Sequence, residues 1–378
     1  MQAAFITGHG GNDVVQVGER SLPARAPGQV RVRMQAATLN QVDLYMRNSG
    51  VGITHQLPQI LGLDGAGIVQ ECDSNDPLLR PGQEVVIHPG VACGRCEFCQ
   101  GGDSALCARI QFLGEHRDGT FAQWVQVPAA QLFPKPAHLD WAEAAALGVN
   151  HLTAWRMLFS KARLQPWETV LIFGIGGGVS LAGLQLAQAI GARVIVTSRE
   201  DGKLERARLL GAAHGINSRT QDVAKEVLSL TGGRGVDVVL ENVGEAVWPS
   251  ALKSLVRGGR LVTCGATTGD QPGADLAPPV RAPVADLRLQ PGQPGRVSRP
   301  APLRAAHRPA ARHRQPLCPG RCAYGAELSG IRPAFRKDHA ASWRCLKATA
   351  MGAMPGSGMA PWKMKIKKQS CQRLPSKR

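Results

Sequence analysis

Four cysteines in one short loop have the number and spacing of metal ligands. Cys93, Cys96, Cys99 and Cys107 follow the pattern C-x2-C-x2-C-x7-C, so one closed loop can bring four thiolates to a single Zn²⁺. Glycine and polar residues fill this loop, which therefore has little hydrophobic core of its own. A shell of four thiolates leaves no open position for water or substrate. The quartet predicts one structural zinc within residues 90–108.

The alternative interpretation of the quartet is a pair of disulfide bonds. Disulfides belong mainly to secreted proteins. The start of the chain, Met1 to Thr7, has no positively charged segment followed by an apolar one, so nothing there marks the chain as secreted. Zinc is therefore favoured over disulfides, and a cytoplasmic location is expected.

A glycine-rich turn is the second feature that could do chemistry. It follows a predicted strand at 169–173 and precedes a predicted helix at 181–190. Glycines let the backbone approach a pyrophosphate, whose charge then lies at the helix N-terminus. Ser180 stands where a third closely packed glycine is usual, which predicts a slightly larger separation of strand and helix. The predicted cofactor contacts at this turn are Gly174, Gly176, Gly177, Gly178 and Val179.

The end of the second predicted strand discriminates between nicotinamide cofactors. NAD-binding proteins place Asp or Glu there for the ribose hydroxyl, whereas the 2′-phosphate of NADPH needs cations and hydroxyls. This chain has Ser198 and Arg199, with Lys203 one turn later, which favours NADPH. Glu200 and Asp201 keep NADH as an alternative. In a second alternative, Arg199 and Lys203 are ordinary solvated charges.

Length and charge bound the class of protein. A chain of 378 residues, 43% hydrophobic, is long enough for two domains. No apolar run reaches about 18 residues, so no membrane span is expected. The net charge is +17, but residues 277–378 hold 21 Lys and Arg against 3 Asp and Glu. Because the basicity belongs to this tail, a nucleic-acid partner for the body of the chain is not expected.

The body has two blocks of different pattern. Short β-rich runs occur at 30–34, 67–69 and 84–87, separated by turn signals. After residue 136 strands alternate with helices: further strands are expected at 193–197, 236–240 and 260–264, and a helix at 203–210. The pattern predicts an α/β protein with a small β domain (1–130), a doubly wound parallel sheet (131–276) and a tail (277–378).

Several further motifs occur in the body: Leu39–Leu44, Gly62–Gly67, Pro81–Val85, Leu113–Gly119 and Gly258–Val262. With the cysteine loop and the glycine turn, in this order, they make residues 1–276 resemble the zinc-type medium-chain dehydrogenase/reductases, in the quinone (enone) oxidoreductase branch. The resemblance implies a GroES-like β domain that holds the substrate pocket, a Rossmann domain, and hydride transfer in the cleft between them. It also implies a homodimer and a small carbonyl or quinone substrate.

The resemblance further suggests which residues act on substrate and cofactor. Family alcohol dehydrogenases hold a second, catalytic zinc with Cys, His and Cys, and the matching positions here are Asn40, Leu63 and Val149. Leu63 and Val149 cannot coordinate a metal. Hydrogen-bond donors must then polarise a carbonyl, and the candidates are Asn40 and Tyr45, oriented by Asp43. Asn40 and Asp43 as turn-capping residues are an equally weighted alternative.

Three more cofactor contacts are expected at the carboxyl ends of later strands. Asn242 and Val243 follow the fourth strand, and Gly265 follows the next one. In a doubly wound sheet the ligand lies at this edge.

The resemblance stops at Leu276. Back-translated and read one base later, Ala277–Asp286 can give a family-like strand, and Arg336–His339 can give the family's closing strand. The favoured interpretation is a one-base insertion near codon 277, followed by a largely irregular segment whose Pro/Arg-rich composition opposes folding. The alternative is a genuine basic tail that binds nucleic acid or an anionic membrane, with its strongest cluster at Lys363, Lys365, Lys367 and Lys368.

Together these features predict an NADPH-dependent oxidoreductase of quinones or α,β-unsaturated carbonyls, with one structural zinc and no catalytic zinc. One alternative is a zinc-dependent alcohol dehydrogenase. The other is an inactive protein that binds a cofactor or interacts through its basic tail.

Overall fold

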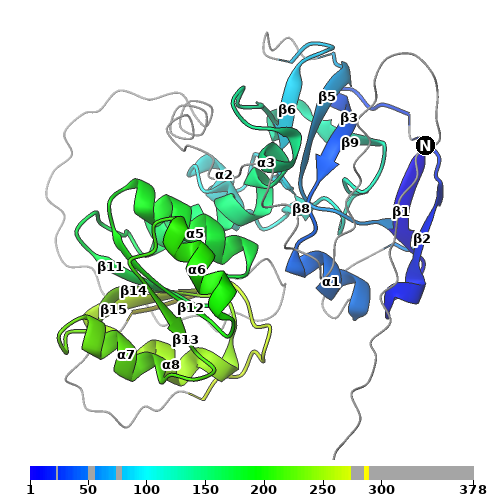
Figure 1. The fold of residues 1–378 in the computed structure, drawn as a ribbon. Helices are drawn as coiled ribbons and strands as arrows, with labels where there is room; N and C mark the ends of the chain where they lie inside the picture. Colours follow the sequence, from blue (N-terminus) through cyan, green and yellow to red (C-terminus); the bar gives the residue numbers. More distant parts are fainter. Residues whose placement is uncertain (23, 50–55, 74–78, 274–284, 289–378) are drawn as a thin grey trace, which may run out of the picture.

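The computed structural model describes residues 1–22, 24–49, 56–73, 79–273 and 285–288. These residues form two lobes that lie side by side, one rich in β-strands and one with alternating strands and helices (Figure 1). A GroES-like lobe and a Rossmann-type parallel sheet confirm the predicted fold class. Most of the segment predicted as an irregular tail lies outside the described residues.

The first lobe is built on an antiparallel sheet with the strand order β10-β6-β5-β3-β9. Its pattern is clearest in β3 (Gln29–Ala37), where Val30 and Val32 are buried while Arg31 between them is half-buried. Successive side chains of a strand point to opposite faces, so this alternation places the valines in the core. The other elements of the lobe are β1 (Gln2–Ile6), η1 (Asn12–Val14), β2 (Val15–Glu19), α1 (Gln41–Asn48), β4 (Gln59–Ile60), β5 (Gly65–Glu71), β6 (Glu84–Ile87), β7 (Gly90–Val91), α2 (Glu97–Gln100), η2 (Ser104–Leu106), β8 (Gln111–Phe112), β9 (Trp124–Pro128), η3 (Ala129–Gln131) and β10 (Leu132–Pro134).

The first lobe extends beyond the predicted boundary at residue 130. Leu132, Phe133 and Pro134 of β10 pair with β6, so they belong to the first sheet. A helical segment then leads into the second lobe through α3 (Trp141–Ala145), η4 (Leu147–His151), α4 (Leu152–Trp155) and η5 (Arg156–Lys161).

The second lobe contains a parallel sheet whose described strands have the order β13-β12-β11-β14-β15-β16. In β11 (Thr169–Ile172), Val170 and Ile172 face one hydrophobic cluster, with α5 and α6, while Leu171 faces another, with α7 and α8. Both faces are covered, which explains why these strands read as continuous apolar runs. The remaining elements are α5 (Gly178–Ala189), β12 (Arg193–Ser198), α6 (Asp201–Leu209), β13 (His214–Asn217), α7 (Val223–Leu230), β14 (Val236–Glu241), η6 (Glu245–Val247), α8 (Trp248–Lys253), β15 (Leu255–Thr263) and β16 (Ala285–Arg288).

Two strands of this sheet were not expected from the sequence. β13 is short and begins with His214 and Gly215, which carry little strand signal. β16 lies within the segment predicted to be largely irregular, and its backbone pairs in parallel with β15, Ala285 opposite Arg260 and Arg288 opposite Thr263. The sheet therefore continues past residue 276.

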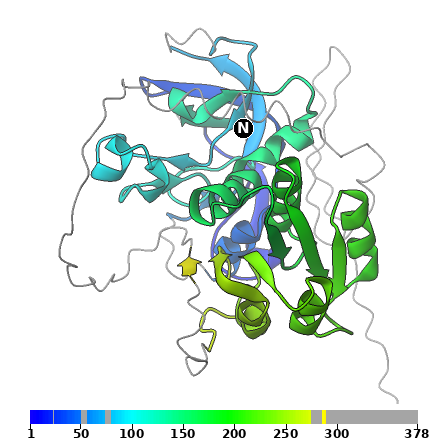
Figure 2. The same ribbon diagram turned by 90° about the vertical axis from the view of Figure 1, so that its left-hand side faces the viewer.

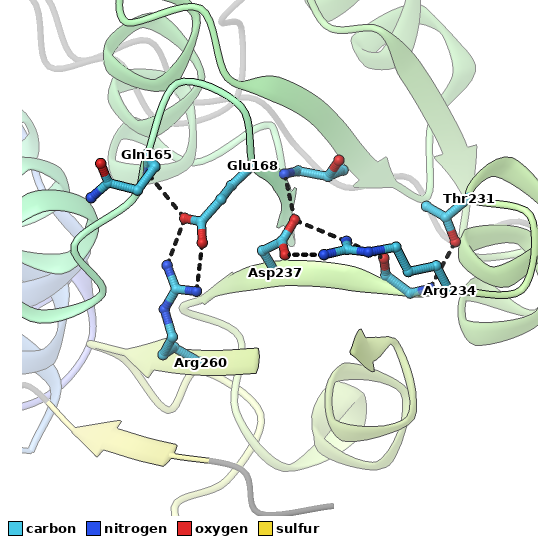
Figure 3. Close-up of polar contacts among 8 residues, drawn as sticks. Gln165, Glu168, Thr231, Arg234, Asp237 and Arg260 are labelled. Carbon is cyan, nitrogen blue, oxygen red and sulfur yellow. Dashed lines mark hydrogen bonds and ion pairs between the residues drawn. The ribbon is translucent and has the colours of Figure 1, made fainter. Parts of the chain in front are cut away.

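Ion pairs cluster near the amino ends of β11, β14 and β15, at the edge opposite the glycine turn. Arg260 donates to Glu168 through two hydrogen bonds of 2.8 and 2.6 Å (Figure 3). In the neighbouring pair, Arg234 donates to Asp237, and Asp237 also accepts from the backbone N–H of Thr169 at 2.9 Å. These carboxylates tie the edge of the sheet together.

Across the described part of the chain, none of the helices is both long enough and apolar enough to span a bilayer.

Candidate functional site

The four cysteines converge on one point. Their sulfur atoms all lie within 4.8 Å of one another, in a loop that projects from the side of the first lobe (cyan in Figure 2). Cys96 and Cys99 Sγ are 3.5 Å apart, far beyond a disulfide bond of about 2.05 Å. A tetrahedron with Zn–S bonds of about 2.3 Å has sulfurs about 3.8 Å apart. The quartet therefore fits a structural zinc, and the four described cysteines of the loop are not disulfide-bonded.

Backbone N–H groups of the loop stabilise one of the four thiolates, whereas burial and crowding of the sulfurs oppose the charge of another. The backbone N–H groups of Cys93 and Arg109 donate to Cys107 Sγ at 3.3 and 3.4 Å. Desolvation and the neighbouring sulfurs raise the pKa of the Cys99 thiol to about 12. Four thiolates so close together repel one another, and a divalent cation removes that repulsion.

A bidentate ion pair joins the cysteine loop to the second lobe. Arg156, at the start of η5, donates to both carboxylate oxygens of Asp103, at 2.8 and 3.2 Å. Because a forked guanidinium fixes the direction as well as the distance of its partner, this pair orients the loop on the helical segment.

The glycine turn lies where the sequence predicts, between β11 and α5. Gly174 adopts a φ of +64°, and Gly177 is the N-cap of α5. Ser180 is fully buried, and its hydroxyl donates to the carbonyl of Phe173 at 2.7 Å. The serine thus bonds the helix directly to the end of the strand. Val179 packs against the hydrophobic core on the same side of the sheet.

The end of β12 carries a cluster of charges around Glu200. Lys203 Nζ donates to Glu200 Oε1 at 2.7 Å, and Ser198 Oγ accepts from the Glu200 N–H at 3.1 Å. The Lys203 side chain also lies over the turn, because a Cβ added to Gly176 would be 3.0 Å from its Cδ. The hydrogen bond and charge of Lys203, followed by the charges of Arg219 and Arg199, lower the pKa of Glu200. Arg219 was missed because only the fold brings it here.

The predicted contacts from β14 and β15 gather beside the glycine turn. Asn242 Nδ2 donates to Ser180 Oγ at 2.9 Å. A Cβ added to Gly174 would lie 3.3 Å from the Val243 side chain, and one added to Gly265 would lie 2.9 Å from the Asn242 carbonyl. The lack of a side chain at these glycines therefore permits the close approach of the three segments.

Glu241, at the end of β14, bonds to the loop that follows this strand, and its role was not predicted. Its side chain is fully buried and accepts from the N–H of Val243, from the N–H of Gly244 at 2.7 Å and from Thr263 Oγ1 at 2.8 Å. Burial raises the pKa of Glu241. The carboxyl thus fixes the loop that carries Asn242 and Val243.

The first lobe contributes a buried polar network around Asp64, which is fully buried. Asp64 Oδ1 accepts from Thr38 Oγ1 at 2.5 Å and from Asn40 Nδ2 at 3.1 Å, while Oδ2 accepts from the N–H of Val149 at 2.8 Å. Burial raises the pKa of Asp64 to about 6, against the effect of these donors. The sequence motif Gly62–Gly67 contains Asp64, but nothing in the sequence indicates its contact with the backbone of Val149, which lies in the second block.

Two of the three predicted catalytic residues belong to this network. Asp43 Oδ2 accepts from the N–H of Asn40 at 2.7 Å, at the start of α1, as the turn-capping alternative expects. Burial, together with the charge of Asp64, raises the pKa of Asp43 to about 8. Tyr45 lies on the same helix with 44% of its surface exposed. The structure thus places Asn40 and Asp43 in contact and Tyr45 at the surface.

Two of the three positions matched to catalytic zinc ligands, Leu63 and Val149, belong to an apolar cluster. Leu63 is buried in a cluster with Ile6, Met46 and Leu61, and Val149 packs against that cluster. Among the described residues, the cysteine quartet is the one group of three or more Cys, His, Asp or Glu side chains close enough to share a metal ion.

Comparison with known proteins gives matches in both lobes. Residues 26–137 match the alcohol dehydrogenase GroES-like domain, and residues 178–285 match the zinc-binding dehydrogenase family. The chain is 36% identical over 242 residues to sorbitol dehydrogenase of Bacillus subtilis (strain 168), which covers 63% of this chain and 68% of that protein.

Solved structures agree with these matches. The crystal structure of an NAD-dependent alcohol dehydrogenase superposes with a TM-score of 0.71 at 39% identity, over 78% of this chain and 85% of the other. A quinone oxidoreductase of Pseudomonas syringae pv. Tomato DC3000 gives 0.64 at 28% identity, over 76% and 81%. Because the likeness spans both lobes, the chain belongs to the zinc-type medium-chain dehydrogenase/reductase family of oxidoreductases, as its motifs predicted.

Proposed function

We propose that the chain transfers hydride from NADPH to a quinone or an α,β-unsaturated carbonyl, with zinc held only by the cysteine quartet. The apolar packing of Leu63 and Val149 carries this proposal. Neither side chain has a donor atom, and the Asn40 carboxamide is already bonded to Asp64 and Asn150. A catalytic zinc requires three protein ligands and an open position.

Hydrogen-bond donors can replace a metal for this class of acceptor. The nicotinamide supplies the hydride when bound, and the charge that reaches a conjugated acceptor spreads over an enolate or a hydroquinone. Asn40 Nδ2 donates to Asp64 and also lies 3.4 Å from Thr38 Oγ1, so a bound carbonyl would compete with Thr38 for its second hydrogen. Tyr45, whose surface is 44% exposed, is the other donor proposed. Asp43 accepts from the N–H of Asn40 and so holds its backbone, and burial raises the pKa of the Asp43 carboxyl to about 8. Donors aimed at a developing oxyanion are worth about 2.7–4 kcal/mol each.

The substrate class is tested by turnover. The full chain is expected to oxidise NADPH with a benzoquinone or a simple enone, and Tyr45→Phe to lower kcat/KM about a hundredfold, whereas Tyr324→Phe, in the tail, should leave it unchanged. Dialysis against a chelator that leaves the quartet loaded should not change the rate. Oxidation of sorbitol or a simple alcohol that depends on a second zinc would instead support an alcohol dehydrogenase, the alternative favoured by the likeness to sorbitol dehydrogenase.

The preference for NADPH rests on the cations at the end of β12. The charges of Arg199, Lys203 and Arg219 act on Glu200, and Lys203 Nζ donates to its Oε1, so the ionised carboxylate there already has a cationic partner. Cations and the Ser198 hydroxyl suit a 2′-phosphate. NADH is the alternative, since Glu200 remains within this cluster.

Arg199→Ala is expected to weaken NADPH binding by about 1.5–3 kcal/mol, because a charge-assisted contact to phosphate is lost, and to leave NADH binding nearly unchanged. The dissociation constants can be measured by quenching of tryptophan fluorescence. Arg208→Ala is the control, since Arg208 lies near the far end of α6 and pairs there with Glu205. Equal affinity of the unmodified chain for both cofactors would contradict the proposal.

We also propose that the protein acts in the cytoplasm as a homodimer. Light scattering of the full chain gives the mass that tests the dimer.

A further inference from the structure

One side chain of the helical segment touches both lobes. Asn150 lies in η4, and its Nδ2 donates to Asn40 Oδ1 at 3.2 Å, at the start of α1. On its other side it meets the glycine turn, because a Cβ added to Gly178 would lie 2.5 Å from Asn150 Oδ1 and 2.7 Å from Nδ2. The amide is therefore wedged between the N-cap of α1 and the first residue of α5.

Asp64 fixes both partners of this contact. It accepts from the side chain of Asn40 and from the N–H of Val149, the residue that precedes Asn150. A Cβ added to Gly148 would lie 2.3 Å from Asp64 Cβ, so the backbone of η4 rests directly on Asp64. The side chain of Asn150 thus links the start of α1 to the start of α5.

We propose that Asn150 is a positioning residue that sets the place of the glycine turn relative to the substrate lobe. The Asn40–Asn150 hydrogen bond transmits the position of α1 to the N-terminus of α5, where the pyrophosphate of the cofactor binds. Asn150 acts through Gly178 and Asn40 rather than on the reacting atoms. The proposal rests on the nicotinamide cofactor of the proposed function, and it is independent of the substrate and of the choice between NADPH and NADH.

A double-mutant cycle on the full chain tests this inference. Asn150→Ala and Asn40→Ala are each expected to weaken the binding of both NADPH and NADH about fivefold to tenfold. The double variant should be no weaker than Asn40→Ala alone, because the contact of Asn150 with Asn40 is already lost in that variant. Ser160→Ala is the control, since Ser160 is exposed near the end of the same helical segment.

A second measurement needs no cofactor. In the free protein, Asn150→Ala and Asn40→Ala should each speed hydrogen exchange at the first amides of α5 that are bonded within the helix, while the control leaves them unchanged. If Asn150→Ala does not fold, Asn150→Ser enters the same cycle with the same criteria. Cofactor affinities within twofold of the unmodified chain, or effects of the two substitutions that multiply, would overturn the proposal. Loss of NADPH preference with the coupling intact would contradict only the proposed cofactor.

Discussion

Cys99→Ser is expected to release the zinc and unfold the cysteine loop, the largest change that a single substitution in this chain should cause. The loop brings four sulfurs within 4.8 Å of one another and has little apolar core of its own to keep it folded. In zinc-finger peptides the metal contributes about 10–16 kcal/mol to folding. A loop that lacks one ligand is therefore expected to lose most of the free energy that keeps it folded. Elemental analysis of the purified full chain should give one zinc per chain, and close to none in the variant.

The matched control is Cys72→Ser, which changes a half-buried cysteine outside the quartet and should leave the zinc in place. Limited proteolysis should cut Cys99→Ser within residues 90–108 while the unmodified chain resists there. Two zincs per chain before mutation would contradict the single-site proposal, and full zinc retention in Cys99→Ser would contradict the assignment of the ligands.

Arg260→Met is expected to destabilise the second lobe by about 3–5 kcal/mol. The substitution leaves the largely desolvated charge of Glu168, whose side chain is 12% exposed, with the N–H of Gln165 as its remaining hydrogen-bond donor among the described residues (Figure 3). Breaking a buried ion pair from one side costs this much because the remaining charge is uncompensated. Arg260 also donates to the carbonyl of Ala162 at 3.0 Å, so the link to the helical segment is lost as well.

The double substitution Arg260→Met with Glu168→Leu should recover most of the loss, since no charge then remains buried. Arg208→Met is the surface control, because its pair with Glu205 is solvated on both sides and is worth at most about 1 kcal/mol. Melting temperatures compare the four proteins. A double variant as unstable as Arg260→Met would show that packing, rather than the buried charge, decides the effect.

What could be predicted from the sequence is what neighbouring residues determine. The cysteine spacing and the glycine turn each lie within a few residues, and the β11 run is apolar because both of its faces are buried. These features predicted the fold class and the four cysteines that lie together in one loop. Ser180 was recognised as a departure from the usual glycine, but its hydrogen bond to Phe173 needed the structure.

The residues that sequence reasoning missed act across long separations. Asp64 meets Val149, and Glu241 meets Thr263, only after two strands or two lobes come together. Neither carboxyl stands in a pattern that periodicity can reveal, because each is a single buried charge whose partners include backbone N–H groups. Arg219 reaches the Glu200 cluster in the same way, from the end of β13, a strand that the sequence did not reveal.

Through the ion pair between Asp103 and Arg156, a zinc bound in the cysteine loop would also affect the helical segment. Arg156 lies about one and a half turns beyond Asn150 on the same helical segment. The cysteine loop and the glycine turn therefore contact this segment at two points. A zinc bound by the quartet would therefore help to fix the helical segment as well as the loop. If the proposed zinc holds the loop, its removal is expected to weaken the binding of the cofactor as well as to unfold the loop.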